Sequence, residues 1–238
     1  GAKSMLADMA REFFKINAVS RLDAIGLADA EGAAKAAATV TFSGTATAAG
    51  TVSVSVGSSK NRTYSVGVIV GMTAAQAATA LAALINADAS APFTAAAVDA
   101  VVTITMSNGG TEGNATLISS GSSVKTGIDI ALGAFTGGAT NPVMTNVLAA
   151  AGDTRYQTLV APYTWGTSYL VSFVDGRWNV ANAILDGVAV IWGHDSLGNA
   201  KTAGAALNSK GLAPFMDKTV SDDDYKGPAI AEFDCIKA

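Results

Sequence analysis

The chain has 238 residues, of which 50% are hydrophobic and 14% charged, and its formal net charge at pH 7 is −4. This length suffices for one large domain or two ordinary ones, and no apolar run approaches the roughly 18–20 residues that a membrane-spanning helix needs. The chain has no lysine/arginine cluster, which argues against nucleic-acid binding, and its single cysteine, Cys235, excludes an internal disulfide and a cysteine-based metal cage and suits a reducing cytoplasm.

The N-terminal segment is predicted to form a helix followed by a strand. Apolar residues recur at the three- and four-residue spacing of a helix, at Met5, Met9, Phe13 and Ile16. Ser4 can cap this helix, and Asp8 lies near its N-terminus, where the helix dipole favours a carboxylate. Val19–Ala28 (VSRLDAIGLA) is predicted to be a strand, and the break at residues 30–33 leads into a segment of another kind.

That segment, residues 36–138, is rich in valine, threonine, serine and glycine and favours β-structure. Apolar and polar residues alternate over residues 39–42, 51–56 and 64–68. This period of two predicts strands with one buried and one solvated face. Further strands are predicted at Phe93–Val98 and Val101–Met106, paired as a hairpin, and near Ala115–Ser119.

One helix is predicted inside this β-rich segment. Thr73 and Gln76 stand three residues apart, the spacing of a capping box, and open a helix that runs to Asn86. Its inner stripe is predicted to be Ala77, Leu81, Leu84 and Ile85. The segment is therefore expected to be a small antiparallel sheet covered by one helix.

The C-terminal part alternates helices and strands. Helices are predicted at residues 141–151, 167–178 and 195–208, and strands at Tyr156–Ala161, Val188–Trp192, Leu212–Met216 and Glu232–Ile236. Such alternation implies parallel strands with right-handed crossovers. Together with Val19–Ala28 it predicts an α/β core, a largely parallel sheet of about four strands with flanking helices. This core would comprise residues 1–35 and 139–238, interrupted by a β-rich α+β domain at residues 36–138.

The sole histidine, His194, stands in Gly193-His194-Asp195-Ser196. These contiguous residues cannot form a hydrolytic triad, because its nucleophile, base and acid must converge from separate segments. The chain also has no Gly-x-Ser-x-Gly elbow. The motif is better explained as a strand end followed by a helix cap.

Other candidate sites have structural explanations too. The glycine-rich stretch Gly109–Asn114 lacks a Walker lysine and is predicted to be a turn. Asp222-Asp223-Asp224 lacks the alternating ligands and the glutamate of a calcium loop and is predicted to be a solvated loop. The tryptophans Trp165, Trp178 and Trp192 are predicted to be core or subunit-interface anchors. We therefore predict no catalytic residue, no cofactor and no metal site, and we expect that the protein is not an enzyme.

Short motifs occur along the chain in a characteristic order. They are Gly1–Phe14 (GAKSMLADMAREFF), Thr39–Val56 (TVTFSGTATAAGTVSVSV), the capped helix Thr73–Ala87, Gly110–Asn114 (GTEGN), Phe135–Pro142 (FTGGATNP) and Val160–Thr164 (VAPYT). In order and spacing they resemble the Mu-like contractile phage tail sheath family, with its Ser-Met-Leu helix and its Gly-Thr-Ala-Thr-Ala-Ala-Gly hairpin. The resemblance covers most of the chain up to about Trp192 and is loose after it.

The resemblance implies a virion structural protein. Sheath subunits of a phage, prophage or tailocin are made in the bacterial cytoplasm, polymerise around a tail tube and contract to drive ejection. The implied partners are other sheath subunits and the tube protein, with no nucleic acid and no membrane. The low charge content agrees with surfaces that are buried against other copies. This chain is too short to hold both terminal arms and the C-terminal domain of the family, so we expect a fragment that is monomeric by itself.

Two alternatives from other functional classes remain open. The β-rich segment could be an adhesin-like module that recognises surface glycans, which exposed aromatic side chains among Phe42, Tyr64, Phe93 and Phe135 would favour. An α/β hydrolase would need a nucleophile that converges with His194 in one pocket.

Overall fold

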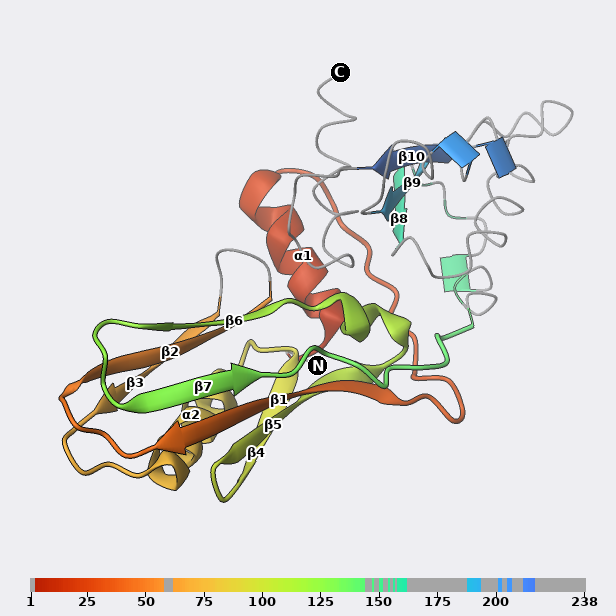
Figure 1. Cartoon of the computed structure of the whole chain (residues 1–238). Helices are drawn as coiled ribbons and strands as arrows, with labels where there is room; N and C mark the ends of the chain where they lie inside the picture. Colours follow the sequence, from red (N-terminus) through yellow and green to blue (C-terminus); the bar gives the residue numbers. More distant parts are fainter. Residues whose placement is uncertain are drawn as a thin grey trace, which may run out of the picture. The chain divides into compact units, whose positions relative to one another are not determined.

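The computed structural model describes residues 3–57 and 62–143 and, beyond them, residues 147, 150–151, 154, 156, 158–161, 188–193, 201–202, 205–206 and 212–216. This described part contains two α-helices and ten strands, which form three sheets (Figure 1). The chain divides into two compact units: residues 1–7 with 31–140 (unit 1) and residues 8–30 with 141–238 (unit 2).

Unit 1 contains two antiparallel sheets. The first has the order β4-β5-β1-β7 and consists of β1 (Lys35–Gly44), β4 (Phe93–Val98), β5 (Val101–Gly109) and β7 (Ile128–Leu132). The second has the order β3-β2-β6 and consists of β2 (Gly50–Val56), β3 (Thr63–Val68) and β6 (Ile118–Ser122). A 3-10 turn, η1 (Thr111–Ala115), connects β5 to β6.

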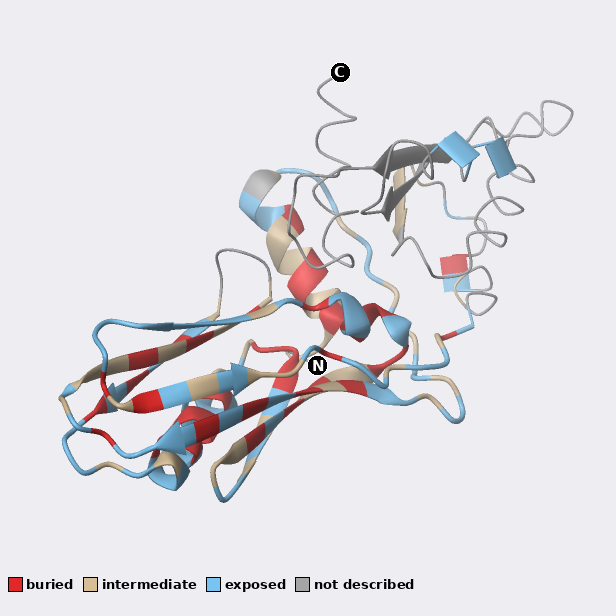
Figure 2. Cartoon of the chain, in the orientation of Figure 1, coloured by how far each residue is buried: buried red, intermediate tan, exposed pale blue. Residues whose placement is uncertain are grey.

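The period-two pattern explains why these segments are strands. Buried residues alternate with mostly exposed ones along β1 and β3 and with half-buried ones along β2, as Figure 2 shows by colour. The valines of β2 are buried, and the threonine and serines between them are half-buried on the opposite face. The predicted strands at residues 39–42, 51–56 and 64–68 and the predicted hairpin are therefore confirmed.

Helix α2 (Ala74–Ala87) packs on both sheets, since it contacts β4, β1 and β5 of the first sheet and β3 of the second. Its predicted capping box is confirmed, with the Gln76 N–H donating to Thr73 Oγ1 and the Thr73 N–H donating to Gln76 Oε1. The predicted inner stripe is wrong at Leu84, which is 40% exposed. Ala78 and Ala82 are buried instead, so the buried face of the helix consists of Ala77, Ala78, Leu81, Ala82 and Ile85.

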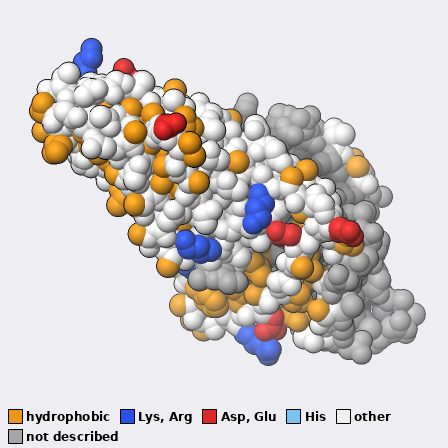
Figure 3. Space-filling view, turned by 90° about the horizontal axis from the view of Figure 1, so that it is seen from below, with side chains coloured by type: hydrophobic (Ala, Val, Ile, Leu, Met, Phe, Trp, Pro, Cys, Tyr) orange, Lys and Arg blue, Asp and Glu red, His pale blue; other side chains and the backbone are white. Residues whose placement is uncertain are grey.

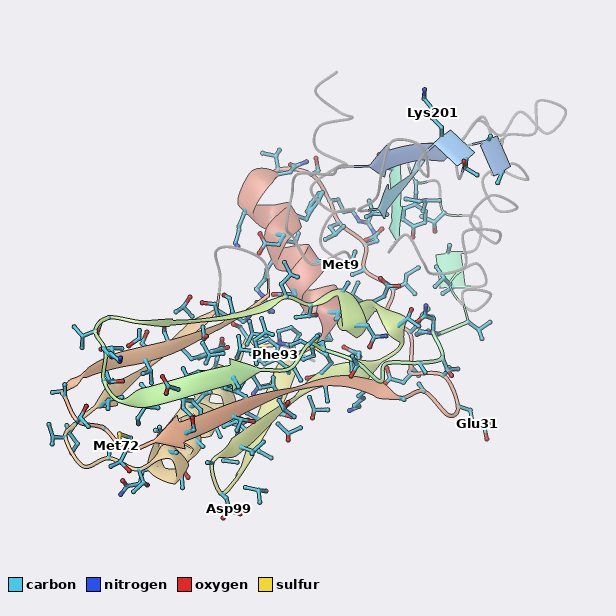
Figure 4. All side chains as sticks on the ribbon, in the orientation of Figure 1. Met9, Glu31, Met72, Phe93, Asp99 and Lys201 are labelled. Carbon is cyan, nitrogen blue, oxygen red and sulfur yellow. The ribbon has the colours of Figure 1, made fainter. Side chains whose placement is uncertain are left out.

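The two sheets and α2 enclose one core. Its largest fully buried side chains include Phe42, Phe93, Leu81 and Ile104. Phe93, labelled in Figure 4, meets Tyr64 of β3 edge to face, with ring centroids 6.3 Å apart, so the first sheet and the second sheet touch through aromatic rings.

Helix α1 (Met5–Ile16) confirms the first predicted element. The Ala7 N–H donates to Ser4 Oγ at 3.2 Å, which is the predicted cap. Asp8 lies in the first turn and forms an ion pair with Arg11 at 3.0 Å. Met5 and Phe13 are buried on its apolar face, as the helical spacing predicts.

The predicted fold class is wrong. Most described strands are antiparallel and lie in the two sheets of unit 1, so the described structure is not a largely parallel α/β core. The predicted strand Val19–Ala28 does not form: none of its residues is buried, and Val19 is 95% exposed. Its apolar residues do not alternate, and Asn17 Oδ1 accepts the N–H groups of Val19 and Ser20, which folds the chain into a turn.

The predicted single sheet of residues 36–138 also needs correction. The segment contains two sheets, the predicted strand at Ala115–Ser119 begins three residues later at Ile118, and β7 was not predicted. Residues 111–115 form η1 because Gly110, with φ 118°, turns the chain where a side chain would be strained.

Unit 2 contains a parallel sheet with the order β10-β9-β8, formed by β8 (Thr158–Ala161), β9 (Val188–Gly193) and β10 (Leu212–Met216). These strands confirm three predicted strands. Five of the eleven residues of the helix predicted at 141–151 lie outside the described residues, as do most residues of the helix predicted at 195–208, all of 167–178 and the strand Glu232–Ile236. Among the helices of the described residues, none has the length and apolarity to cross a membrane.

Candidate functional site

Most residues that could carry chemistry lie outside the described residues. These are His194 with Asp195 and Ser196, the aspartates 222–224, Trp165, Trp178 and Cys235. Trp192 lies in β9, of which only the backbone is described. Among the residues that are described, no three His, Cys, Asp or Glu side chains gather where a metal ion could bind.

The chain enters and leaves the β-rich part of unit 1 through two paired segments, residues 34–37 and 136–139, which we call the neck (Figure 1). The Ala34 N–H donates to Ala139 O at 3.0 Å, and the Ala139 N–H returns the bond at 3.1 Å. Ala37 and Thr136 exchange a second pair of bonds, at 2.9 and 3.0 Å. Residues that are about a hundred positions apart in the sequence are thus held side by side.

The glycine-rich stretch Gly109–Asn114 is hydrogen-bonded to this neck. Asn114 Nδ2 donates to Gly138 O at 2.9 Å, and the Gly138 N–H donates to Asn114 Oδ1 at 2.9 Å. The Gly110 N–H donates to Ala34 O at 3.0 Å. The stretch therefore connects the end of β5 to both segments of the neck through hydrogen bonds. This structural role agrees with its prediction as a turn.

One cluster of polar side chains surrounds Asp88, the residue that follows α2. Tyr64 Oη donates to Asp88 Oδ2 at 3.0 Å, while the N–H and the hydroxyl of Ser90 donate to Oδ1 at 2.9 and 2.7 Å. Arg62 Nε lies 3.7 Å from Asp88 Oδ2, and Arg62 Nη2 donates to Ser90 O at 3.1 Å. The cluster joins the start of β3 to the connection between α2 and β4.

The electrostatics of this cluster favour a permanent carboxylate. Burial raises the pKa of Asp88, but the hydrogen bonds from Ser90 and Tyr64 and the charge of Arg62 together hold it below the ordinary value of 3.8. A carboxylate that stays ionised at neutral pH and is saturated with donors is a poor general base. The cluster therefore has a structural role, which is to hold the start of β3 against the connection between α2 and β4.

At the end of unit 1 away from Glu31, an exposed apolar turn follows β3. Ile69 and Val70 are 71% and 66% exposed, and Val98 in the β4–β5 hairpin is 70% exposed. The turn is held by backbone bonds, with the Gly71 N–H donating to Ala46 O and the Ala46 N–H donating to Met72 O. Figure 4 labels Met72 and Asp99 at this end. Two aliphatic side chains are therefore presented on an ordered backbone.

Unit 1 carries little charge around these features. Residues 31–140 include five acidic and four basic residues, and residues 63–87 include none. Figure 3 shows a face on which blue and red atoms are isolated among white and orange ones. Exposed surfaces with so few charges are prone to association.

The outward face of the β3-β2-β6 sheet is polar but uncharged. Directly opposed residues there are serine, threonine or glycine: Ser53 faces Ser65 and Gly121, and Ser55 faces Thr63 and Ser119. The hydroxyls of Ser55 and Thr63 are 2.7 Å apart. This face offers hydrogen-bonding groups without an ionisable or aromatic anchor.

Comparisons with known proteins identify no family. No family model matches the chain, and no curated protein matches it. A crystal structure of the D1–D2–D3 domains of the flagellar cap protein FliD from Escherichia coli is similar at 14% sequence identity and a TM-score of 0.25, covering 59% of this chain and 53% of that one. The chain thus spans about half the length of that structure, and a TM-score this low does not establish a shared fold.

Sequence reasoning missed the Asp88 cluster and the two hydrogen bonds between Asn114 and Gly138. An Asp-x-Ser sequence directly after a predicted helix is typical of a side chain that caps the next turn, so Asp88 and Ser90 carried a usable signal. The partners Arg62 and Tyr64 are distant in sequence and carried none.

Proposed function

We propose that this chain is part of a structural subunit of a contractile phage, prophage or tailocin tail sheath, which polymerises around a tail tube. The observation that carries the proposal is the neck: a β-rich domain is inserted into the chain through two adjacent, hydrogen-bonded segments. This layout lets a subunit keep its assembling parts in one unit and carry a compact domain beside them. The ordered motifs of the sheath family support the same assignment, with both neck segments inside them or next to them.

The surface of unit 1 supports an assembling protein over a free enzyme. Its nine charged residues among positions 31–140 leave long uncharged stretches. Helical polymers need heterologous interfaces that repeat without closing, and uncharged surfaces lower the repulsion between many identical copies.

The adhesin-like alternative lacks the observation that would favour it. Phe42, Tyr64, Phe93 and Phe135 are all buried, so none of the aromatic rings named for a glycan platform is available at the surface. No specific observation supports the hydrolase alternative either, since the segment around His194 lies outside the described residues.

Negative-stain electron microscopy of the complete gene product that contains this sequence tests the proposal. We expect hollow striated tubes or stacked rings, and tubes of two lengths if the sheath contracts. A double variant, Ile69→Asp with Val70→Asp, serves as a control, because it adds charge at an exposed turn of the inserted domain, which the sheath proposal locates on the outside. Tubes should persist in this variant. Dispersed particles across a range of salt and protein concentrations would contradict the proposal.

A further inference from the structure

Strand β7 forms one edge of the β4-β5-β1-β7 sheet, and within the described residues its neighbour is β1. The Gly133 N–H donates to Thr39 O at 2.8 Å. Because bonded pairs alternate along an antiparallel ladder, Ala131 and Asp129 bond to β1, and the backbone groups of Ile130 and Leu132 point away from it. The edge of β7 therefore presents an N–H and a C=O at each of these two residues.

The opposite edge of the same sheet is closed by a side chain. Asn86 Nδ2 donates to Ala95 O at 2.7 Å, and the Ala95 N–H donates to Asn86 Oδ1 at 2.9 Å. The amide thus satisfies the outward backbone groups at the middle of β4, much as a neighbouring strand would. Proteins protect edge strands in such ways to prevent unwanted pairing, and β7 has no equivalent device among the described residues.

The side chains of β7 also suit a further strand. Ile130 lies opposite Phe42, and Leu132 lies opposite Val40, so both share the core face of the sheet. Phe42 and Val40 are fully buried, whereas Ile130 and Leu132 remain partly exposed. A strand added beside β7 would cover them and extend the apolar row by one position.

We propose that β7 pairs with β7 of a second copy of this chain, antiparallel and centred on Ile130. In this register Ile130 exchanges both backbone bonds with Ile130 of the second copy, and Ile128 faces Leu132. Asp129, the one charged residue of the strand, faces Ala131, so no like charges are directly opposed. The two four-stranded sheets become one sheet of eight strands. Because Asn86 closes each outer edge, the pairing ends at two copies and does not continue into a fibre.

Such an interface is small. Five residues from each copy bury far less than the roughly 800 Å² per partner of a stable complex, so the separate chain is largely monomeric at low concentration.

Register-specific disulfide formation tests the pairing. On a Cys235→Ser background, Asp129→Cys and Ala131→Cys are prepared as two separate full-length proteins and oxidised at high concentration, alone and mixed. The proposed register sets position 129 directly opposite position 131 at about 4.5 Å between Cα atoms, within disulfide range. Identical positions lie two residues out of register, beyond that range. We expect about ten times more covalent dimer in the mixture than in either protein alone.

A second variant checks that the strand edge is responsible. Ile130→Pro removes the outward N–H and no backbone bond to β1, which an edge strand tolerates, and it also shortens the apolar side chain at the centre of the pairing. Adding it to both proteins should abolish the excess in the mixture. Far-UV circular dichroism establishes that all variants are folded. No dimer in the mixture, or equal dimer in all three samples, would overturn the proposal.

Discussion

Gly138 sits where the neck leaves no room for a side chain. An ideal Cβ at this position would fall well inside the contact distance of the Gly110 carbonyl oxygen, 2.9 Å from Asn114 Oδ1 and 3.2 Å from Ala36 Cβ. The nearest obstacle is backbone, so it cannot rotate away as a flexible side chain could. Gly138→Ala is therefore expected to push residues 136–139 away from Gly110, Asn114 and Ala36.

The magnitude follows from two effects. Overpacking a filled site costs about 1–3 kcal/mol, and weakening the two bonds between Asn114 and Gly138 adds about 1 kcal/mol. We expect Gly138→Ala to lower the free energy of unfolding of unit 1 by about 2–4 kcal/mol, which corresponds to a fall in Tm on the order of 10 °C for a domain of this size.

Gly67→Ala is the matched control. Gly67 lies in β3 with nothing within 4 Å of an added Cβ and without a positive φ, so the substitution should leave stability unchanged or raise it slightly. Urea unfolding followed by far-UV circular dichroism compares the two variants. Tryptophan fluorescence follows unit 2 separately, because Trp165, Trp178 and Trp192 all lie between residues 141 and 238. If Gly138→Ala unfolds at the same urea concentration as Gly67→Ala, the argument for a filled neck is refuted.

Three further predictions concern α2 and its surroundings. Leu81→Ala should destabilise unit 1 by about 2–5 kcal/mol because Leu81 is fully buried. Leu84→Ala, on the exposed side of the helix, should cost less than about 1 kcal/mol. Similar unfolding midpoints for the two variants would contradict the observed packing. Thr73→Ala removes one half of the capping box and should cost about 1 kcal/mol in thermal unfolding, with an unchanged Tm as the contrary result. Asp88 has a lowered pKa in the folded protein, so its stabilising contribution is present above about pH 4, the pKa of an unfolded aspartate, and is lost as the pH falls through the folded value. Asp88→Asn should therefore be less stable than the parent at pH 7 and lose less stability on acidification, and parallel stability–pH curves would show that the cluster does not act in this way.

Local patterns predicted the elements of unit 1 well, because their causes are local. Alternation in β2 and β3 and the Thr73/Gln76 capping box depend on residues a few positions apart. The strand prediction for Val19–Ala28 was wrong because it depended on apolar content without alternation. A strand there would have needed a neighbouring strand to pair with, which local sequence does not reveal.

The sheet arrangement could not be predicted, because it depends on distant pairs. β1 lies between β5 and β7, and β2 lies between β3 and β6, so both sheets combine the beginning and the end of the segment. The strand β7 has only five residues between glycines, and its partner Thr39–Gly44 is about ninety residues earlier. The two hydrogen bonds at the neck similarly join Asn114 to Gly138, and the sequence around either residue does not predict its partner.

The neck has an evolutionary consequence. Because Ala34 and Ala139 face each other across one backbone bridge, a turn of a few residues could connect the flanking chain directly. A gene segment that encodes the intervening hundred residues can then be gained, lost or exchanged between related genes without redirecting the polypeptide on either side. Homologous chains should accordingly differ by whole cassettes at this point, while the residues before and after it stay in register.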